Sequence, residues 1–415
     1  MNDFDEKDLL IRELRERSGD VDGSSIGFHA VRHSARRMQR RRNIVGGAVA
    51  AVVATAAVPG GLAVTSALND GRDPVDGSTI AATPSEATPA PAPTPRPDGT
   101  FVMTLDGLTR GEDAQVPYID YPRAALVTPD GSMGLPTVYQ KITRYDDGWL
   151  ALGYEGDGAE MFLLTDDMEV TRSFPSGDTF VVSDDGSRVV YVQIEDDGTQ
   201  TLVNAPTDGL DPQTWSLPES PAVQPIGLVD EGSVVYETLA ADGTQAVSLA
   251  TAEGVTELEG FVAGEDAGTT TGLVIGQTRS DMVQGSCWGI MDPAASTTDL
   301  VWETCDYWLK SFSPDGRHIA ATVPDADGLG APTLTVLDAE SHEPVVEFSN
   351  DRKHQSALFQ GAWEDDDTVV GIVTEGTTFQ LVRYELDGRA EAASDPVEVD
   401  PERDDFPLRF ATDAW

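Results

Sequence analysis

The sequence predicts an all-β fold made of repeated antiparallel sheets. Three observations support this: 40 glycines and 26 prolines among 415 residues, strands that alternate apolar and polar residues, and sharp acidic turns that return at a near-regular interval. Glycine and proline at this level suit a turn-rich β protein. A chain of this length also exceeds one ordinary hydrophobic core, so it needs either several domains or one large domain built from repeats.

The stretch SFSPDGRHIAATV, residues 311–323, shows the repeated unit most clearly. Alternating residues, a reversal at Asp-Gly and renewed alternation are typical of a β-hairpin, because Asp-Gly tolerates the positive φ of a tight turn. Six segments follow this template, and their acidic turns end at residues 148, 186, 232, 268, 316 and 367. The steps of 38, 46, 36, 48 and 51 residues bracket the blade length of a four-stranded β-propeller.

The two ends of the repeat region predict a closed ring. Residues 115–135 supply strands without a complete sheet of their own, and residues 406–410 form a late strand after the sixth segment. Joining the two in one sheet completes another blade and removes exposed edges that promote aggregation. We therefore expect a seven-bladed β-propeller over residues 100–415, with six or eight blades as alternatives.

The segment FSPDGR at residues 312–317, echoed by VSDDGSR at residues 182–188, resembles the WD40-like repeat of TolB-type bacterial propellers. The chain lacks the Trp-Asp pair that ends a strand in true WD40 repeats. With its arginine-rich start, apolar segment and Pro-rich stretch, the layout is similar to membrane-anchored envelope proteins of Gram-positive bacteria that are poorly characterised. This resemblance implies architecture more than function, because the fold hosts many functions.

Residues 44–68 form an uncharged segment of 25 residues, which is long enough to span a bilayer as a helix. Basic residues precede this segment, and acidic residues follow it. The positive-inside rule then places the N-terminus in the cytoplasm and the C-terminal domain outside the cell membrane. The membrane-proximal basic cluster consists of Arg36, Arg37, Arg40, Arg41 and Arg42.

Two other interpretations of residues 44–68 stay open. The Pro-Gly-Gly break at residues 59–61 and a small-residue site at 65–67 fit a cleaved signal peptide, and Arg41-Arg42 fits a loose twin-arginine motif. The polar leader of residues 1–43 is long for a secretion signal, so we expect an uncleaved anchor.

The segments on either side of this anchor have distinct characters. Residues 1–43 predict a cytoplasmic, Arg-rich leader with short amphipathic helices. Residues 69–99 form a linker rich in Pro, Thr and Ala, which favours the extended polyproline II conformation. Such a linker acts as a semi-rigid spacer between membrane and propeller.

The distribution of charge excludes nucleic acid as a partner. The chain has 27 Lys and Arg against 72 Asp and Glu, and the leader holds 10 of the basic and 8 of the acidic residues. That leaves 17 basic and 64 acidic residues beyond position 43, a net charge of −47. Such a field repels DNA, RNA and anionic lipid, while many of the aspartates precede glycine and serve as turn residues.

Cys287 and Cys305 are the two cysteines of the chain, and both lie on the expected exported side, where disulfides persist. They are symmetric about residue 296, so a hairpin centred there brings them opposite each other at a separation that a disulfide can bridge. No basic residue or histidine close to them in sequence supports a reactive thiol or a metal pair. We expect a structural disulfide.

Motifs for catalysis or metal binding are missing from the sequence. It has no G-x-S-x-G, and His318, His342 and His354 do not fall in a metal-ligand pattern. Acidic residues at 325–328 and 364–367 offer the oxygen ligands that calcium prefers, but neither run fits a calcium loop, and ordinary turns explain both. We expect no enzyme activity, no cofactor and no metal, and tryptophans that fill the spaces between blades.

These observations together predict a binding module that recognises an envelope protein or a cell-wall component, because the loops of many blades converge on one rim. One alternative is a transmembrane signalling protein that resembles an anti-sigma factor and docks a cytoplasmic partner through its leader. The other is a glycan-acting enzyme that uses the propeller channel.

Overall fold

A computed structural model of the chain describes residues 94–155, 158–195, 197–217, 222–240, 242–281, 285–324, 330–351, 353–399, 406–412 and 414–415. The expected leader, the apolar segment 44–68, the basic cluster and most of the linker lie outside these residues. Within the described ranges, no helix has the length and apolar character needed to cross a membrane.

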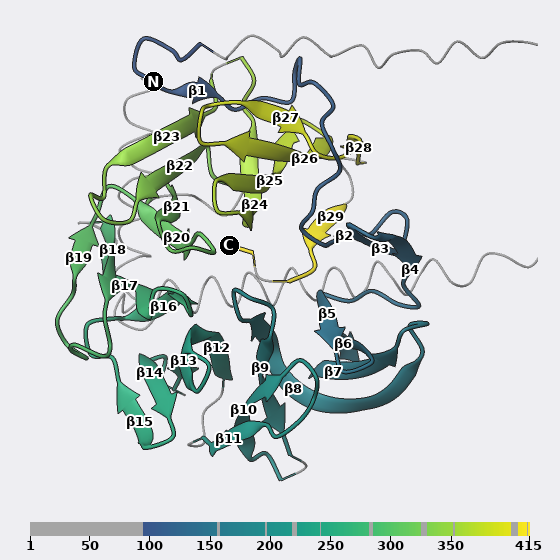
Figure 1. The fold of residues 1–415 in the computed structure, drawn as a ribbon, viewed down its shortest axis with the longest axis vertical. Helices are drawn as coiled ribbons and strands as arrows, with labels where there is room; N and C mark the ends of the chain where they lie inside the picture. Colours follow the sequence, from purple (N-terminus) through teal and green to yellow (C-terminus); the bar gives the residue numbers. More distant parts are fainter. Residues whose placement is uncertain are drawn as a thin grey trace, which may run out of the picture. The chain divides into compact units, whose positions relative to one another are not determined.

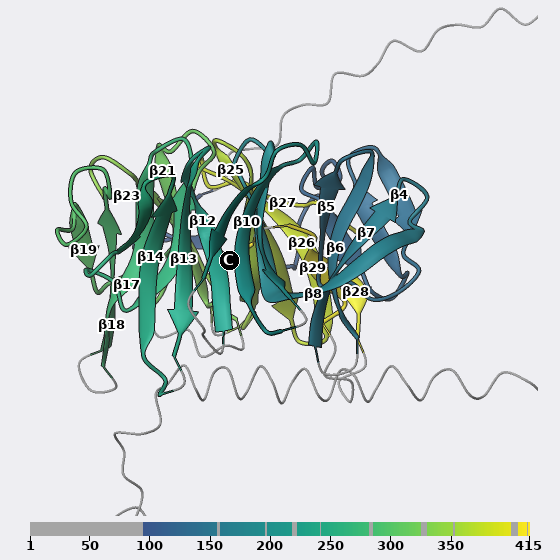
Figure 2. The ribbon, with the colours of Figure 1, turned by 90° about the horizontal axis from the view of Figure 1, so that it is seen from below.

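The described residues form strands and turns, and the strands make six hydrogen-bonded sheets arranged around a common axis (Figures 1 and 2). The chain is therefore an all-β β-propeller, as the sequence predicts. Two sheets contain four consecutive strands each: β12 (Ala222–Asp230), β13 (Ser233–Leu239), β14 (Gln245–Thr251) and β15 (Gly254–Glu257), then β16 (Ala263–Gly268), β17 (Leu273–Asp281), β18 (Gly285–Met291) and β19 (Trp302–Thr304).

Two further sheets have five strands, because each gains a short strand at its outer part. The first contains β20 (Trp308–Phe312), β21 (His318–Thr322), β22 (Thr333–Asp338), β23 (Pro344–Ser349) and the early strand β1 (Phe101–Val102). The second contains β24 (Ala357–Asp365), β25 (Thr368–Glu375), β26 (Thr378–Glu385), β27 (Ala390–Ala392) and β28 (Val397–Glu398).

The expected closure of the ring is confirmed by a four-stranded sheet built from both ends of the described chain. Strand β29 pairs antiparallel with β2, with Tyr118 opposite Phe410 and Asp120 opposite Leu408, and Figure 1 shows the two side by side. This sheet contains β2 (Tyr118–Asp120), β3 (Ala125–Thr128), β4 (Gly131–Gly134) and β29 (Leu408–Phe410).

The expectation of seven separate blades is corrected. Five of the six sheets have the four or five strands of a blade, and the sixth is a continuous sheet of seven strands. The cause is β8, whose 13 residues pair with β7 in their first part and with β9 in their second, across a register shift between Ser176 and Phe180. The strands are β5 (Lys141–Tyr145), β6 (Gly148–Glu155), β7 (Gly158–Thr165), β8 (Val170–Val182), β9 (Arg188–Ile194), β10 (Gln200–Pro206) and β11 (Gln213–Ser216).

The acidic turn after β20 shows why the repeated motif reverses the chain. Gly316 has a φ of 74°, a left-handed conformation that favours glycine. Ser313 Oγ donates to Asp315 Oδ1 at 2.8 Å and accepts from the backbone N–H of His318 at 3.0 Å. The turn at residues 183–188 repeats these contacts with its own serine and aspartate. Side-chain hydrogen bonds thus satisfy backbone groups that a tight turn leaves unpaired.

One of the six expected turns is misplaced. Glu265 and Asp266 lie within β16, and the reversal comes later, at residues 269–272. A register shift beside Asp266 distorts β16, where Glu265 pairs with Lys310 at 3.0 Å and Asp266 accepts from the backbone N–H of Phe312 at 3.0 Å. These two carboxylates therefore join neighbouring sheets instead of capping a turn.

Buried apolar side chains lie between each sheet and the next, as stacking of incomplete sheets requires. A further cluster lies within the seven-stranded sheet, between its β6–β7 and β8–β10 parts. Trp288 of β18 and Trp308 of β20 stack with ring centroids 5.3 Å apart across one such boundary. Trp149 packs in the cluster between β2–β4 and β5–β7. These tryptophans fill the spaces between sheets, as expected.

Residues 101–114 cross the outer parts of two sheets before β2 begins, and we call this segment the strap. Its strand β1 pairs parallel with β23, with Phe101 opposite Phe348. Farther along, Gly111 and Ala114 donate backbone hydrogen bonds to β27 and to the residue that follows it, at 3.0 and 2.9 Å. The strap thus covers the outer edges of the β20–β23 sheet and the β24–β27 sheet before the chain enters β2.

Candidate functional site

Backbone and side-chain contacts bring together, on one face of the ring, turns that directly precede β6, β9, β17, β21 and β25. The backbone N–H of Asp146 donates to Thr207 O at 2.5 Å, and that of Thr207 donates to Ser187 O at 2.8 Å. Asp184 Oδ2 accepts from Thr269 Oγ1 at 2.8 Å, although 85 residues separate the two in sequence. Three turns are therefore linked directly or through one neighbour.

The linkage continues around the ring. Thr271 lies so close to Gly316 that a Cβ there would come within 2.2 Å of its methyl group. Arg317 Nη2 lies 3.9 Å from a carboxylate oxygen of Asp367 in the next turn. We call this surface the turn face, defined by residues 146–147, 183–187, 231–232, 269–272, 313–317 and 366–367.

The turn face is strongly acidic. Its six turns contain one basic residue, Arg317, and eight carboxylates. Water screens these exposed groups, so the charge acts mainly on partners that approach closely. The carboxylates belong to Asp146, Asp147, Asp184, Asp185, Glu231, Asp315, Asp366 and Asp367.

A hollow of about 370 Å³ lies beside the turn at residues 366–367. At its centre, Arg383 donates to both carboxylate oxygens of Glu364 and, at 2.6 Å, to Glu391. The hydrogen bonds from Arg383 to Glu364 raise the pKa of this guanidinium, so it stays charged although its side chain is only 10% exposed. The lining residues are Glu112, Gln115, Glu364, Asp365, Thr368, Arg383, Glu385 and Glu391.

A second hollow, of about 470 Å³, lies between the β12–β15 and β16–β19 sheets. Apolar side chains such as Val229 and Leu249 share its wall with Asp230, Asp292 and Thr271. Because it is bordered by the β12–β13 and β16–β17 turns, this hollow also opens near the turn face. The surface therefore combines negative charge with two recesses.

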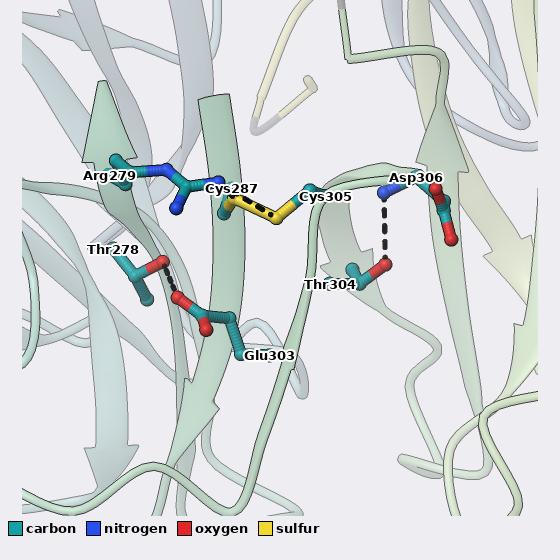
Figure 3. The surroundings of a disulfide bond; sticks show 7 residues. All are labelled: Thr278, Arg279, Cys287, Glu303, Thr304, Cys305 and Asp306. Atoms are coloured by element: carbon teal, nitrogen blue, oxygen red, sulfur yellow. Dashed lines mark hydrogen bonds between the residues drawn. A yellow bond between two sulfur atoms is a disulfide. The ribbon is translucent and has the colours of Figure 1, made fainter. Parts of the chain in front are cut away.

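The predicted disulfide between Cys287 and Cys305 is confirmed. Cys287 is in β18 and fully buried, whereas Cys305 follows β19 and is exposed (Figure 3). Arg279 of β17 lies opposite Cys287, with Nη2 2.7 Å from its Sγ and 3.4 Å from Sγ of Cys305. The expectation that no basic residue accompanies the cysteines is corrected, because strand pairing supplies one.

Sequence reasoning missed Arg279 because only residues near the cysteines in the chain were considered. The available signal was the hairpin itself. If β17 and β18 pair as a hairpin, counting back from Asp281 opposite Gly285 places position 279 opposite Cys287. The register is unbroken over these pairs, and the register shift between Gln277 and Arg279 lies beyond them, so hairpin counting alone leads to Arg279.

Two of the three histidines make contacts that join neighbouring sheets. His318 Nδ1 lies 3.2 Å from the backbone oxygen of Asp366. His342 stacks on Trp302 with ring centroids 4.2 Å apart and nearly parallel planes. Both are partly exposed.

The third histidine belongs to the described group that comes nearest in composition to a hydrolytic triad. Thr104 Oγ1 lies 3.0 Å from Nδ1 of His354, and Glu375 Oε1 lies 3.1 Å from the same nitrogen. A relay needs the acid and the nucleophile on different ring nitrogens. This cluster instead ties the strap to β25, and Glu375 also accepts from the backbone N–H of Leu105 at 3.0 Å.

The acidic residues at 364–367 serve other contacts. Glu364 binds Arg383, and Asp365 Oδ1 accepts from the backbone N–H of Asp367 at 2.9 Å. The other acidic run, at residues 325–328, lies outside the described residues. Among the residues that the structure does describe, no group of three or more His, Cys, Asp or Glu side chains is placed to hold a metal ion.

No family model matches the chain, and no curated protein matches it. Solved structures with similar folds include a puromycin-hydrolyzing peptidase of Mycobacterium tuberculosis, at 14% identity and a TM-score of 0.45 over 73% of this chain and 56% of that one. An acylaminoacyl peptidase is similar at 9% identity and a TM-score of 0.40, over 61% and 46%. TolB from Acinetobacter baumannii is similar at 12% identity and a TM-score of 0.36, over 69% and 64%.

These similarities concern the propeller fold and include the TolB-type propellers that the repeat resembles. The match covers less than two thirds of each of the three chains named above. The expectation that the chain is not an enzyme is corrected, because peptidases are among the similar structures.

Proposed function

We propose that this protein is a membrane-anchored interaction module, with residues 1–43 in the cytoplasm and the propeller outside the cell, which binds an envelope protein or a cell-wall component through the turn face. The observation that carries the proposal is the convergence of six turns, from five of the six described sheets, on one surface with two recesses. Rims of this kind suit recognition because many loops contribute to one surface.

The charge of the turn face favours a partner that carries basic groups. Eight carboxylates and one arginine in the turns attract such groups and repel anionic polymers. The hollow around Arg383 adds further carboxylates, of which Glu364 and Glu391 are already paired. A basic protein segment or an amine-bearing wall polymer fits this surface better than a phosphate-rich one.

The proposal is tested with the full-length protein in detergent, incubated with isolated cell walls and, separately, with solubilised membrane proteins of the source organism. The turn-face variant carries Asp146→Asn, Asp366→Asn and Asp367→Asn. If each of the three carboxylates pairs with a basic group of the partner at about 0.5 kcal/mol, their loss lowers the affinity roughly tenfold. Binding by the unaltered protein should also weaken as salt is added.

The matched control removes three carboxylates from the β9–β10 and β13–β14 connections, with Glu195→Gln, Asp197→Asn and Asp242→Asn. Its net charge equals that of the turn-face variant, so an equal loss in both would point to total charge instead of a specific face. Binding that is unchanged in the turn-face variant would contradict the proposal.

A further inference from the structure

The two sulfur atoms of the disulfide differ sharply in access. Cys287 has 0% exposure, whereas Cys305, which follows the outermost strand of its sheet, is exposed. An external thiolate must approach a sulfur along the line of the S–S bond, so it can reach Cys305 and not Cys287. Attack on Cys305 makes Cys287 the leaving group.

Arg279 is placed at the sulfur that would leave. Its Nη2 lies 2.7 Å from Cys287 Sγ, closer than the 3.4 Å to Cys305 Sγ, and its backbone is paired with that of Cys287. A disulfide sulfur is a weak acceptor, so the contact contributes little in the oxidised protein. A thiolate at the same position receives a charge-assisted hydrogen bond, which is roughly twice as strong as a neutral one.

We propose that the Cys287–Cys305 bond is a thiol-exchange site, attacked at Cys305 and opened toward Cys287, where Arg279 stabilises the departing thiolate. In the first step an external thiolate forms a bond to Cys305 Sγ, the Cys287–Cys305 bond breaks, and Cys287 Sγ keeps its electron pair. When the reagent is a dithiol, its second thiolate attacks its own bound sulfur and releases Cys305. The dithiol is oxidised to a disulfide by two electrons, and its two protons pass to the cysteines or to water.

The strand beside the bond is suited to respond to this exchange. β19 has three residues and pairs with β18 through Trp288–Thr304, Gly289–Glu303 and Ile290–Trp302. Trp302 stacks on His342 of the next sheet. Once the bond opens, β19 keeps its backbone pairs, the stacking of Trp302 and the hydrogen bond from Thr278 Oγ1 to Glu303 Oε1 at 2.6 Å, but it loses its covalent tie, so exchange loosens one outer corner of the ring.

The proposal is tested on the full-length protein with dithiothreitol, by following the appearance of thiols with a maleimide label. Arg279→Met removes the charge and nearly keeps the length of the side chain, whereas Arg279→Lys keeps the charge. Because Arg279 is exposed and partly screened, we expect Arg279→Met to slow opening by about three- to tenfold and Arg279→Lys to restore most of the rate. The matched control is Arg389→Met, an exposed arginine at the β26–β27 turn.

Arg279 could instead act by attracting the attacking anion. The rates are therefore repeated with cationic cysteamine and anionic 2-mercaptoethanesulfonate. If Arg279 stabilises the leaving thiolate, Arg279→Met slows the reaction with both reagents by the same factor. Slowing of the reaction with the anionic reagent alone would overturn the proposal. An equal effect of Arg389→Met would also overturn it.

The direction of opening is measured without any substitution. The wild-type protein is treated with a monothiol, quenched with acid and digested, and the mixed disulfide is located by mass spectrometry. We expect the adduct on Cys305. An adduct on Cys287 would show that the assigned direction is wrong, whether or not the Arg279 variants fold.

Discussion

Strands β29 and β19 are the same length and make the same number of pairs, yet they are secured in different ways. Each has three residues and pairs with its neighbour through three residue pairs. β29 lies at the inner end of its sheet, and Leu408 and Phe410 are 3% and 1% exposed. β19 lies at the outer end of its sheet, where Glu303 is exposed and Trp302 partly so.

The difference shows how position in the ring decides what a short strand needs. Three backbone pairs stabilise a strand only marginally. At the inner end, two apolar side chains of β29 reach the cluster between neighbouring sheets, so burial holds the strand although the chain between β2 and β29 is long. At the outer end β19 buries little, and a disulfide ties the residue that follows it.

The largest effect should come from the strand that burial holds. Phe410→Ala removes a fully buried ring from the cluster that joins β29 to β24–β26, so the free energy of unfolding should fall by about 3–5 kcal/mol. Urea denaturation followed by circular dichroism measures the loss. Because β29 closes the ring, sedimentation should also show more self-association as strand edges become exposed.

The matched control for this substitution is Phe406→Ala, four residues earlier in the same segment. Phe406 is 37% exposed and packs against Phe359 at 4.8 Å, so its loss should cost roughly 1 kcal/mol. Equal costs for the two variants would mean that the segment as a whole, and not the burial of β29, closes the ring.

Removal of the disulfide should have the second-largest effect. Cys287→Ser together with Cys305→Ser frees a loop with a sequence separation of 18, which a chain-entropy estimate values at about 3 kcal/mol. If β19 frays by itself, the global loss will be smaller than this, and hydrogen exchange will be faster at residues 302–304 than in β17. Reduction of the wild-type protein is the control that leaves the sequence unchanged. If the free energy of unfolding falls as much as in Phe410→Ala, the contrast between the two strands is contradicted.

Much of this contrast is predictable from the sequence, because it depends on local patterns. Asp-Gly turns indicated the hairpins, the separated strands at 115–135 and 406–410 indicated the closure, and the symmetric spacing of the cysteines indicated their pairing. What escaped prediction depends on register. The register shifts in β8 and β16 merge two expected blades and move a turn. Such shifts are set by packing between sheets, which spacing along one strand does not report.

The strap provides a third case, because its edge strand β1 has no covalent bond and its own two residues are at most partly buried, although Met103 directly after it is fully buried. β1 has two residues and adds in parallel to β23. Directly after it, Thr104 Oγ1 donates to Glu375 Oε2 at 3.0 Å, and the backbone N–H of Leu105 donates to the same oxygen at 3.0 Å. The hydrogen bonds to Glu375 therefore help to hold β1 at its sheet edge, as the disulfide helps to hold β19.

The smallest effect should come from the loss of this carboxylate charge. Partial burial raises the pKa of Glu375, but hydrogen bonds from Leu105, His354 and Thr104 outweigh it and hold the pKa below its ordinary value of 4.5. A lowered pKa in the folded state gives stability that is present above 4.5 and is lost as the pH falls through the folded value. Glu375→Gln should therefore cost about 1 kcal/mol near neutral pH, and the difference from wild type should shrink between about pH 5 and pH 3. The control in the same denaturation series is Glu340→Gln, which changes an exposed carboxylate. If the loss of unfolding free energy in Glu375→Gln stays constant down to about pH 3, the charge of this carboxylate does not hold the strap.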